Sequence, residues 1–146
     1  MRILIAWISP MLNSAGGAEK VIVNLANEMQ RRGHICTIMY CTEKEGKLFF
    51  PLDKDVKLLN LLWFSQDKRF ESLSMNMKQK LFREIWRIID KRKVKDLNTN
   101  FWIEKFGTAV KLLLDQESPD IILTVDYRTN SVFDRINKKI NFLLLE

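Results

Sequence analysis

The first 41 residues constrain the fold most, because their pattern changes from a continuous apolar run to helical spacing and back. Residues 2–8 are apolar after the initial Arg, which is typical of a strand covered on both faces of a parallel sheet. A polar loop, 9–17, follows, and apolar residues then recur at helical spacing over 18–29. Gly33 stands where helices favour a terminal glycine, and 35–41 form a second predicted strand. This order predicts one right-handed βαβ unit.

The rest of the chain continues to alternate strands with helices after a charged connection. We predict a weak strand at 56–62, helices at 73–93 and 101–114, a strand at 121–125, a short helix at 131–137 and an apolar run at 140–145. The fold predicted is α/β, a Rossmann-like open and mostly parallel sheet with helices on both faces. The length of 146 residues suits one domain, 1–146. Because the sequence stops inside an apolar segment, we expect this domain to be truncated.

Hydropathy and cysteine spacing favour a cytoplasmic protein. The longest apolar runs, such as 3–8, are far shorter than the ~18 residues that a membrane span needs. Residues 1–10 lack the cleavage site of a secretory signal. Cys36 and Cys41 flank a β-branched stretch, so a strand would hold them ~16 Å apart on opposite faces. A disulfide needs Cα atoms within ~7 Å, and we therefore expect two reduced, buried thiols.

The loop before the first predicted helix is the first candidate ligand site. In open α/β sheets, ligands bind beyond the carboxyl ends of the strands. Gly16 and Gly17 allow backbone amides to approach a ligand closely, and the helix that follows directs its free N–H groups to the same place. These features suit a phosphate. The alternative is that the two glycines only permit a tight turn, and neither a GxGxxG nor a Walker A motif is present.

Four segments together resemble a known family. They are Gly-Gly-Ala-Glu at 16–19, Val-x-x-Asn-Leu-Ala-x-x-Met at 21–29, Arg-Gly-His at 32–34 before a strand, and Ser-Pro-Asp-Ile-Ile-Leu at 118–123. This combination is similar to the amino-terminal half of GT-B glycosyltransferases, specifically glycosyltransferase family 4. Close matching covers 1–41 and 118–125, whereas 42–117 match only in layout.

The resemblance implies a two-domain retaining hexosyltransferase that uses a nucleotide sugar, such as a UDP-sugar, with no metal and no other cofactor. The amino-terminal domain holds a sugar or lipid-linked acceptor, and Gly16 and Gly17 match the loop that approaches the donor phosphate. The family's Glu-x7-Glu motif and the His after its fifth strand have no counterpart, so the donor-binding domain is absent and no catalytic residue is assigned. The chain alone is expected to be inactive, as half of an enzyme of cell-surface polysaccharide or glycolipid synthesis.

Two loop segments supply the acceptor-side candidates. Asp126, Tyr127 and Arg128 follow a predicted strand at its carboxyl end, where ligand-facing residues belong. Asn13 and Ser14 lie in the glycine loop itself. The main alternative for Asp126 is that its carboxylate caps a helix or a turn.

The positive charge is gathered in one stretch. The net charge is +6, and residues 66–95 hold ten basic against four acidic side chains, which accounts for the whole excess. The predicted helix 73–93 combines an apolar stripe with flanking basic residues, as interfacial membrane helices do. Each basic residue adds ~1 kcal/mol near an anionic surface. The membrane-facing candidates are Lys78, Arg83, Trp86 and Arg87.

Three interpretations of this basic helix remain open. It packs its stripe on the sheet as an ordinary domain helix, or it docks on the anionic inner face of a membrane as part of a peripheral protein. Nucleic-acid binding is the third and least favoured interpretation, because no recognisable motif accompanies the charge. A second functional hypothesis follows, in which the chain is a non-catalytic, stand-alone half that docks to a membrane or a partner subunit through 73–93. The oligomeric state is not predicted.

Overall fold

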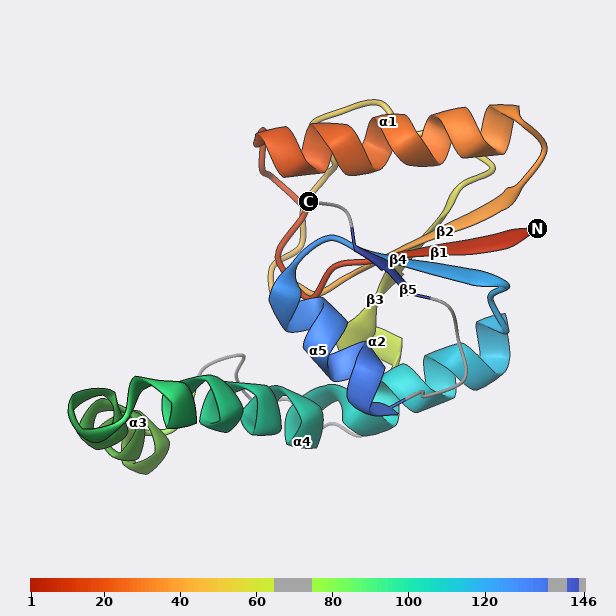
Figure 1. Ribbon diagram of the computed structural model, residues 1–146. Helices are drawn as coiled ribbons and strands as arrows, with labels where there is room; N and C mark the ends of the chain where they lie inside the picture. The colour runs from red at the N-terminus through yellow and green to blue at the C-terminus, as the bar shows by residue number, and fades with distance from the viewer. Residues whose placement is uncertain (65–74, 137–141, 145–146) are drawn as a thin grey trace.

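A parallel sheet with helices on both faces forms the centre of the molecule (Figure 1). The computed structural model describes residues 1–64, 75–136 and 142–144. The elements are β1 (Arg2–Ala6), α1 (Gly17–Arg31), β2 (Ile35–Tyr40), β3 (Lys57–Asn60), α2 (Leu61–Phe64), α3 (Met77–Ile89), α4 (Lys91–Glu117), β4 (Ile121–Thr124), α5 (Tyr127–Ile136) and β5 (Phe142–Leu144). Among these residues the sheet has five strands in the order β3-β2-β1-β4-β5, and all pairings are parallel. The predicted α/β fold is confirmed.

The position of β1 in the sheet explains why its sequence is continuously apolar. Successive side chains of a strand point to opposite faces, and each face of this sheet is covered. Ile3 and Ile5 pack with α1, whereas Leu4 and Ala6 pack with α2, α4 and α5. Figure 1 shows α1 along one face and the other three helices along the opposite face. All four side chains are therefore removed from water, which strongly stabilises the strand.

The two cysteines lie on opposite faces of the sheet, as their odd spacing predicts. Cys36 belongs to the cluster beneath α1, and Cys41 belongs to the cluster beneath α4. Both are buried free thiols. Burial raises the pKa of Cys36, and it raises the pKa of Cys41 to about 12. The thiols therefore remain protonated and unreactive at neutral pH.

The end of α1 matches its sequence signal. Gly33 adopts a φ of +83°, which glycine tolerates without steric cost. The Gly33 N–H donates to the Gln30 carbonyl at 2.9 Å, and the His34 N–H donates to the Met29 carbonyl at 3.1 Å. These bonds satisfy carbonyls that a helix end leaves free. They also place His34 at the amino edge of the sheet, away from the edge where ligands bind.

Two predicted boundaries are wrong, one at the end of β3 and one at the start of α5. The strand predicted at 56–62 is β3, and it ends at Asn60 because that side chain turns the chain into α2. Asn60 donates to the Thr42 carbonyl at 2.8 Å and accepts from the Leu62 N–H at 3.2 Å. The helix predicted at 131–137 begins earlier, at Tyr127, as α5.

The helix predicted at 73–93 is wrong at its carboxyl end, because Asp90 divides the segment into two helices. The Asp90 N–H ends α3 by donating to the Trp86 carbonyl at 2.7 Å, and its carboxylate caps α4 by accepting from the Arg92 N–H at 3.0 Å. At the other end, α3 begins with a capping box between Asn76 and Gln79. Residues 73 and 74 lie outside the described part. The helix predicted at 101–114 falls in the carboxyl-terminal part of the longer α4, which already begins at Lys91.

The helix α3 and the start of α4 form an arm that extends away from the sheet (Figure 1). No residue of α3 is buried, so the interpretation in which this helix packs its stripe on the sheet is wrong. Its large exposed apolar side chains are Met77, Leu81, Phe82, Ile85, Ile88 and Ile89. None of the helices in the described ranges combines the length and hydropathy that crossing a bilayer requires.

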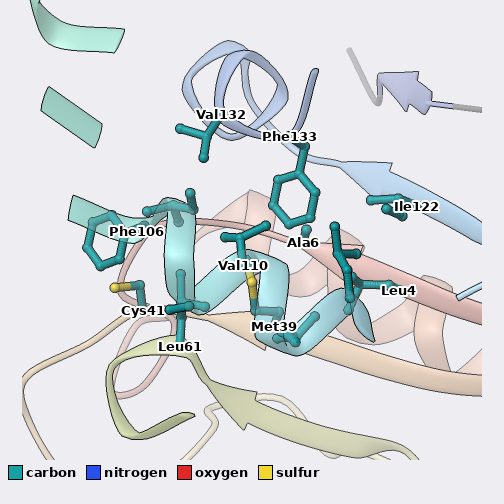
Figure 2. Packing of buried hydrophobic residues seen from close by; sticks show 14 residues of the cluster. Leu4, Ala6, Met39, Cys41, Leu61, Phe106, Val110, Ile122, Val132 and Phe133 are labelled. Atoms are coloured by element: carbon teal, nitrogen blue, oxygen red, sulfur yellow. The ribbon is translucent and has the colours of Figure 1, made fainter. Parts of the chain in front are cut away.

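The core should be far more sensitive to truncation than the arm. Phe133 is fully buried and points from α5 toward the strands (Figure 2), so we expect Phe133→Ala to lower the free energy of unfolding by about 3–5 kcal/mol. The smaller change Ile122→Val should cost about 0.5–1.5 kcal/mol and remain measurable if the first variant does not fold. Urea denaturation followed by circular dichroism gives both values.

The matched control is Ile88→Ala on α3, where the side chain is 88% exposed. We expect this variant to lie within about 0.5 kcal/mol of the wild type. A loss as large as that of Ile122→Val would contradict the exposed position of the arm.

Candidate functional site

The loops after β1 and β4 meet at the carboxyl edge of the sheet. The chain reverses its direction of winding here, since β2 lies on one side of β1 and β4 lies on the other. Ligands of open α/β sheets bind at such a switch point. Three hydrogen bonds join the end of β1 and its loop to the β4 loop and the start of α5: Trp7 Nε1 to Asp126 Oδ2 at 3.2 Å, Ile8 N to Thr129 Oγ1 at 2.9 Å, and Val125 N to Ala6 O at 3.2 Å. The β4 loop is therefore held firmly against β1.

Asp126 has a structural role at this edge, because its carboxylate caps a helix, which is the alternative that the sequence left open. It directly precedes α5, and its Oδ1 accepts from the Thr129 N–H at 2.7 Å, which is the contact of a helix cap. Its other oxygen accepts from the Trp7 indole. Tyr127 and Arg128 occupy the first turn of α5 and are exposed. Binding of an acceptor by 126–128 stays a prediction.

The glycine loop leads directly into α1. Gly16 is the N-cap of the helix, and it has no capping side chain. The Glu19 side chain is buried in the first turn, where a Cβ on Gly16 would collide with its carboxylate. A Cβ on Gly17 would meet no atom within 4 Å. A phosphate would thus have to approach from the open Gly17 side, because the carboxylate at Gly16 repels it.

Asn13 holds the neighbouring loop in place. Its backbone is left-handed, with a φ of +58°. The Asn13 side chain donates to the Glu45 carbonyl at 3.1 Å and accepts from the Lys47 N–H at 3.2 Å. These bonds occupy both ends of the amide, so Asn13 is tied to the 45–47 turn. Ser14 beside it is half-buried.

A hollow of about 620 Å³ opens between the arm and the start of α5. Its lining consists of Met75 just before α3, Lys80 and Arg83 from α3, Asn98, Thr99, Phe101 and Trp102 from α4, and Asp126, Tyr127 and Arg128 from the β4–α5 junction. The structure thus brings one predicted membrane-facing residue, Arg83, to the three acceptor-side candidates of 126–128. It does not bring Asn13 or Ser14 to the same lining.

The α4 residues of this hollow were missed by sequence reasoning. Phe101 is the first residue of the helix predicted at 101–114, and Asn98 and Thr99 lie before it, in the part of α4 that the spacing does not predict. The one available signal was an aromatic pair, Phe101 and Trp102, next to polar residues. Amphipathic spacing alone does not distinguish a core-facing aromatic from one that lines a hollow.

Trp102 is the fixed centre of the hollow's wall. Its ring stacks on buried Phe106 with centroids 5.4 Å apart and an interplanar angle of 12°. The Arg128 guanidinium carbon lies 4.9 Å from the Trp102 ring centroid, within cation–π range. Arg128 therefore presents positive charge on an aromatic base in this wall. Lys105 lies outside the lining, with its Nζ 5.5 Å from the Phe101 ring centroid, and partial burial lowers the pKa of this lysine.

The four membrane-facing candidates do not share one environment. Arg83 and Arg87 each pair with Glu84 at 3.0 Å, and Lys78 is exposed. Trp86 is half-buried, with Lys93 Nζ 4.1 Å from its ring centroid. The three cations thus lie at the surface of α3, whereas the indole packs back toward α4.

Comparison of the sequence with family models and with curated proteins gives no match. The class that the fold defines is the Rossmann-like open parallel sheet. Among the described residues, no three His, Cys, Asp or Glu side chains gather as metal ligands. The functional argument therefore depends on the geometry of this edge.

The cap at α5 makes a direct prediction about stability. Asp126→Ala should lower the free energy of unfolding by about 0.5–2 kcal/mol, because the Thr129 N–H loses its acceptor. Asp126→Asn retains an acceptor oxygen and should stay close to the wild type. The control is Asp134→Ala, which removes an exposed carboxylate from the same helix. Equal stability of Asp126→Ala and Asp134→Ala in thermal denaturation would contradict the capping role.

Proposed function

We propose that residues 1–146 form the acceptor-side domain of a retaining, nucleotide-sugar-dependent glycosyltransferase of cell-surface polysaccharide or glycolipid synthesis. In this proposal the protein acts in the cytoplasm, at the inner face of the membrane. The observation that carries it is the hollow beside the sheet's carboxyl edge, which combines aromatic, amide and cationic side chains. Clefts with these polar groups beside aromatic walls suit small polar ligands.

The glycine loop gives further support, since it lies at the same edge of the sheet. In the proposed reaction the donor phosphate, for example of a UDP-sugar, rests on the open Gly17 side of the α1 N-terminus. The backbone N–H groups and the helix dipole stabilise the charge that develops on the leaving nucleotide. The acceptor lies in the hollow next to 126–128. The sugar-bearing half of the cleft belongs to the donor domain that the resemblance implies.

The test is a transfer assay on the product of the complete reading frame that contains these residues. We expect release of nucleoside diphosphate from a nucleotide sugar, dependent on a cellular lipid or glycan acceptor. Gly17→Glu should lower kcat/KM by about 10²-fold, because its carboxylate opposes the donor phosphate. The space around Gly17 is open and acids are favourable in a first helical turn, so this variant should fold.

The control for this assay is Asn24→Glu, which adds the same charge to an exposed position further along α1. It should transfer at the wild-type rate. Equal rates for Gly17→Glu and Asn24→Glu would contradict the phosphate loop. Failure to release nucleoside diphosphate from any common nucleotide sugar would contradict the transferase itself.

A second candidate function is supported by the arm. Six large apolar side chains of α3 are exposed, and Lys78, Lys80, Arg83 and Arg87 accompany them against one acid, Glu84. A helix with this composition lies in the interface of an anionic membrane. Docking would serve the transferase by bringing it to a lipid-linked acceptor. It would equally serve a non-catalytic half that only binds a membrane or a partner subunit.

Vesicle sedimentation tests the docking. We expect the chain to sediment with phosphatidylcholine vesicles that contain phosphatidylglycerol, and much less with phosphatidylcholine alone. Reversing Lys78, Arg83 and Arg87 to Glu should abolish sedimentation, since each basic residue contributes about 1 kcal/mol at such a surface. The control reverses exposed lysines elsewhere, Lys20, Lys54 and Lys111, for the same change in net charge. Equal loss in both triple variants would indicate that only net charge matters and contradict docking by α3.

A further inference from the structure

The hollow between the arm and α5 is lined by more positively charged side chains than by carboxylates that could pair with them. Lys80, Arg83 and Arg128 line it against a single carboxylate, Asp126. Both oxygens of Asp126 already accept hydrogen bonds, from the Trp7 indole and from the Thr129 N–H. Within the described ranges, neither Lys80 nor Arg128 is ion-paired with a carboxylate. Arg83 is paired with Glu84, so Lys80 and Arg128 are the two lining cations left to bind a ligand, and two cationic donors suit a phosphate group.

The cations reach the hollow from two separate elements. Lys80 and Arg83 are one helical turn apart on α3, and Arg128 lies across from them in the first turn of α5. Arg128 is held over the Trp102 ring, and that ring is held in turn by buried Phe106. A guanidinium placed on an aromatic face keeps its in-plane N–H groups for oxyanions and loses little freedom on binding. Arg128 is therefore the best-oriented anion donor of the hollow.

The rest of the lining suits a carbohydrate better than a bare anion. Asn98 and Thr99 offer an amide and a hydroxyl, which can donate to and accept from hydroxyl groups. Phe101 and Tyr127 add aromatic surface beside them. The volume of about 620 Å³ is well above what a phosphate ion fills and falls within the usual range of small-molecule pockets.

We propose that this hollow binds a sugar that carries a phosphate group, with the phosphate between Lys80 and Arg128 and the sugar ring along 98–101. The inference rests on the proposed function where it makes this ligand the acceptor of the transfer. Binding itself does not depend on it. The same chemistry occurs in free sugar phosphates and in phosphate-linked sugars and polyols of lipid headgroups, and the experiment separates the two sources.

The experiment titrates the 146-residue chain with glucose 6-phosphate, inorganic phosphate and glucose, and follows the indole N–H signals by nuclear magnetic resonance. We expect glucose 6-phosphate to bind more tightly than either of the other two and to shift the Trp102 signal, which Trp102→Phe identifies. Arg128→Gln and Lys80→Gln should each weaken this binding about ten-fold or more, since each removes a charged hydrogen-bond donor. Both side chains are exposed, so both variants should fold.

The matched control is Arg135→Gln, an exposed arginine two turns further along α5 and outside the hollow. It should bind as the wild type does. Equal affinity for glucose 6-phosphate and inorganic phosphate would overturn the proposal, and so would equal affinity of wild type and Arg128→Gln.

A second experiment compares sedimentation with phosphatidylinositol vesicles and with phosphatidylglycerol vesicles. If Arg128→Gln weakens sedimentation only with phosphatidylinositol, the sugar phosphate site accepts a lipid-linked headgroup. If Arg128→Gln weakens sedimentation with neither kind of vesicle but loses binding of glucose 6-phosphate in solution, the ligand is a free sugar phosphate. Binding that is intact in a full-length protein without transfer activity would leave this site standing and overturn only the proposed transferase.

Discussion

The two-sided burial of β1 is the constraint on which the rest of the structure depends. This strand pairs with β2 on one edge and β4 on the other, and helices cover both of its faces. A strand in that position has no surface left for water, so its neighbours must arrive as parallel crossovers from both directions. The chain therefore winds outward through β2 and β3 and then crosses back to β4. That return creates the switch point at the carboxyl edge, where 126–128 lie.

The long helix α4 connects this buried centre to the exposed arm. Its second half supplies Phe106 and Val110 (Figure 2), together with Leu113, to the core. Its first half passes out of the core beside α3 (Figure 1). A helix that changes surroundings along its length has no single apolar face. The helices of the arm are accordingly stabilised by local contacts at their ends, chiefly the capping box at Asn76 and the two caps that Asp90 provides. Trp102 lies where the two halves meet, which is why it can anchor Arg128.

Elements with one dominant signal could be predicted from the sequence. The first βαβ unit has an uninterrupted apolar strand, a regular helical stripe and a terminal glycine at Gly33, and each agrees with the others. The predicted boundaries of the middle region are wrong where a single side chain determines the local structure against the hydrophobic pattern. Asp90 interrupts a run of helix-forming residues by serving both neighbouring helices, and Asn60 ends β3 by turning its amide to the backbone. Hydrophobic spacing carries no information on such contacts.

The candidate site was only partly predictable for a related reason. Position at a strand's carboxyl end pointed to 126–128, because topology alone places such residues together. The hollow also needs Lys80 and Trp102, which are distant in sequence and belong to helices whose packing the pattern did not give. Their approach depends on where α4 leaves the core, and that in turn depends on tertiary contacts such as the stack of Trp102 on Phe106.

The arm combines the two proposed binding surfaces on one helix. At 100° per residue, Lys80, Arg83 and Arg87 share one side of α3, whereas Leu81, Ile85 and Ile89 lie on the other. The first side lines the hollow through Lys80 and Arg83, and the second is exposed. Because α3 carries both sides, an α3 that lies in a membrane interface would bring the hollow to the level of the lipid headgroups. A phosphate-linked sugar of a headgroup would then be within reach of Lys80 without any movement of the sheet.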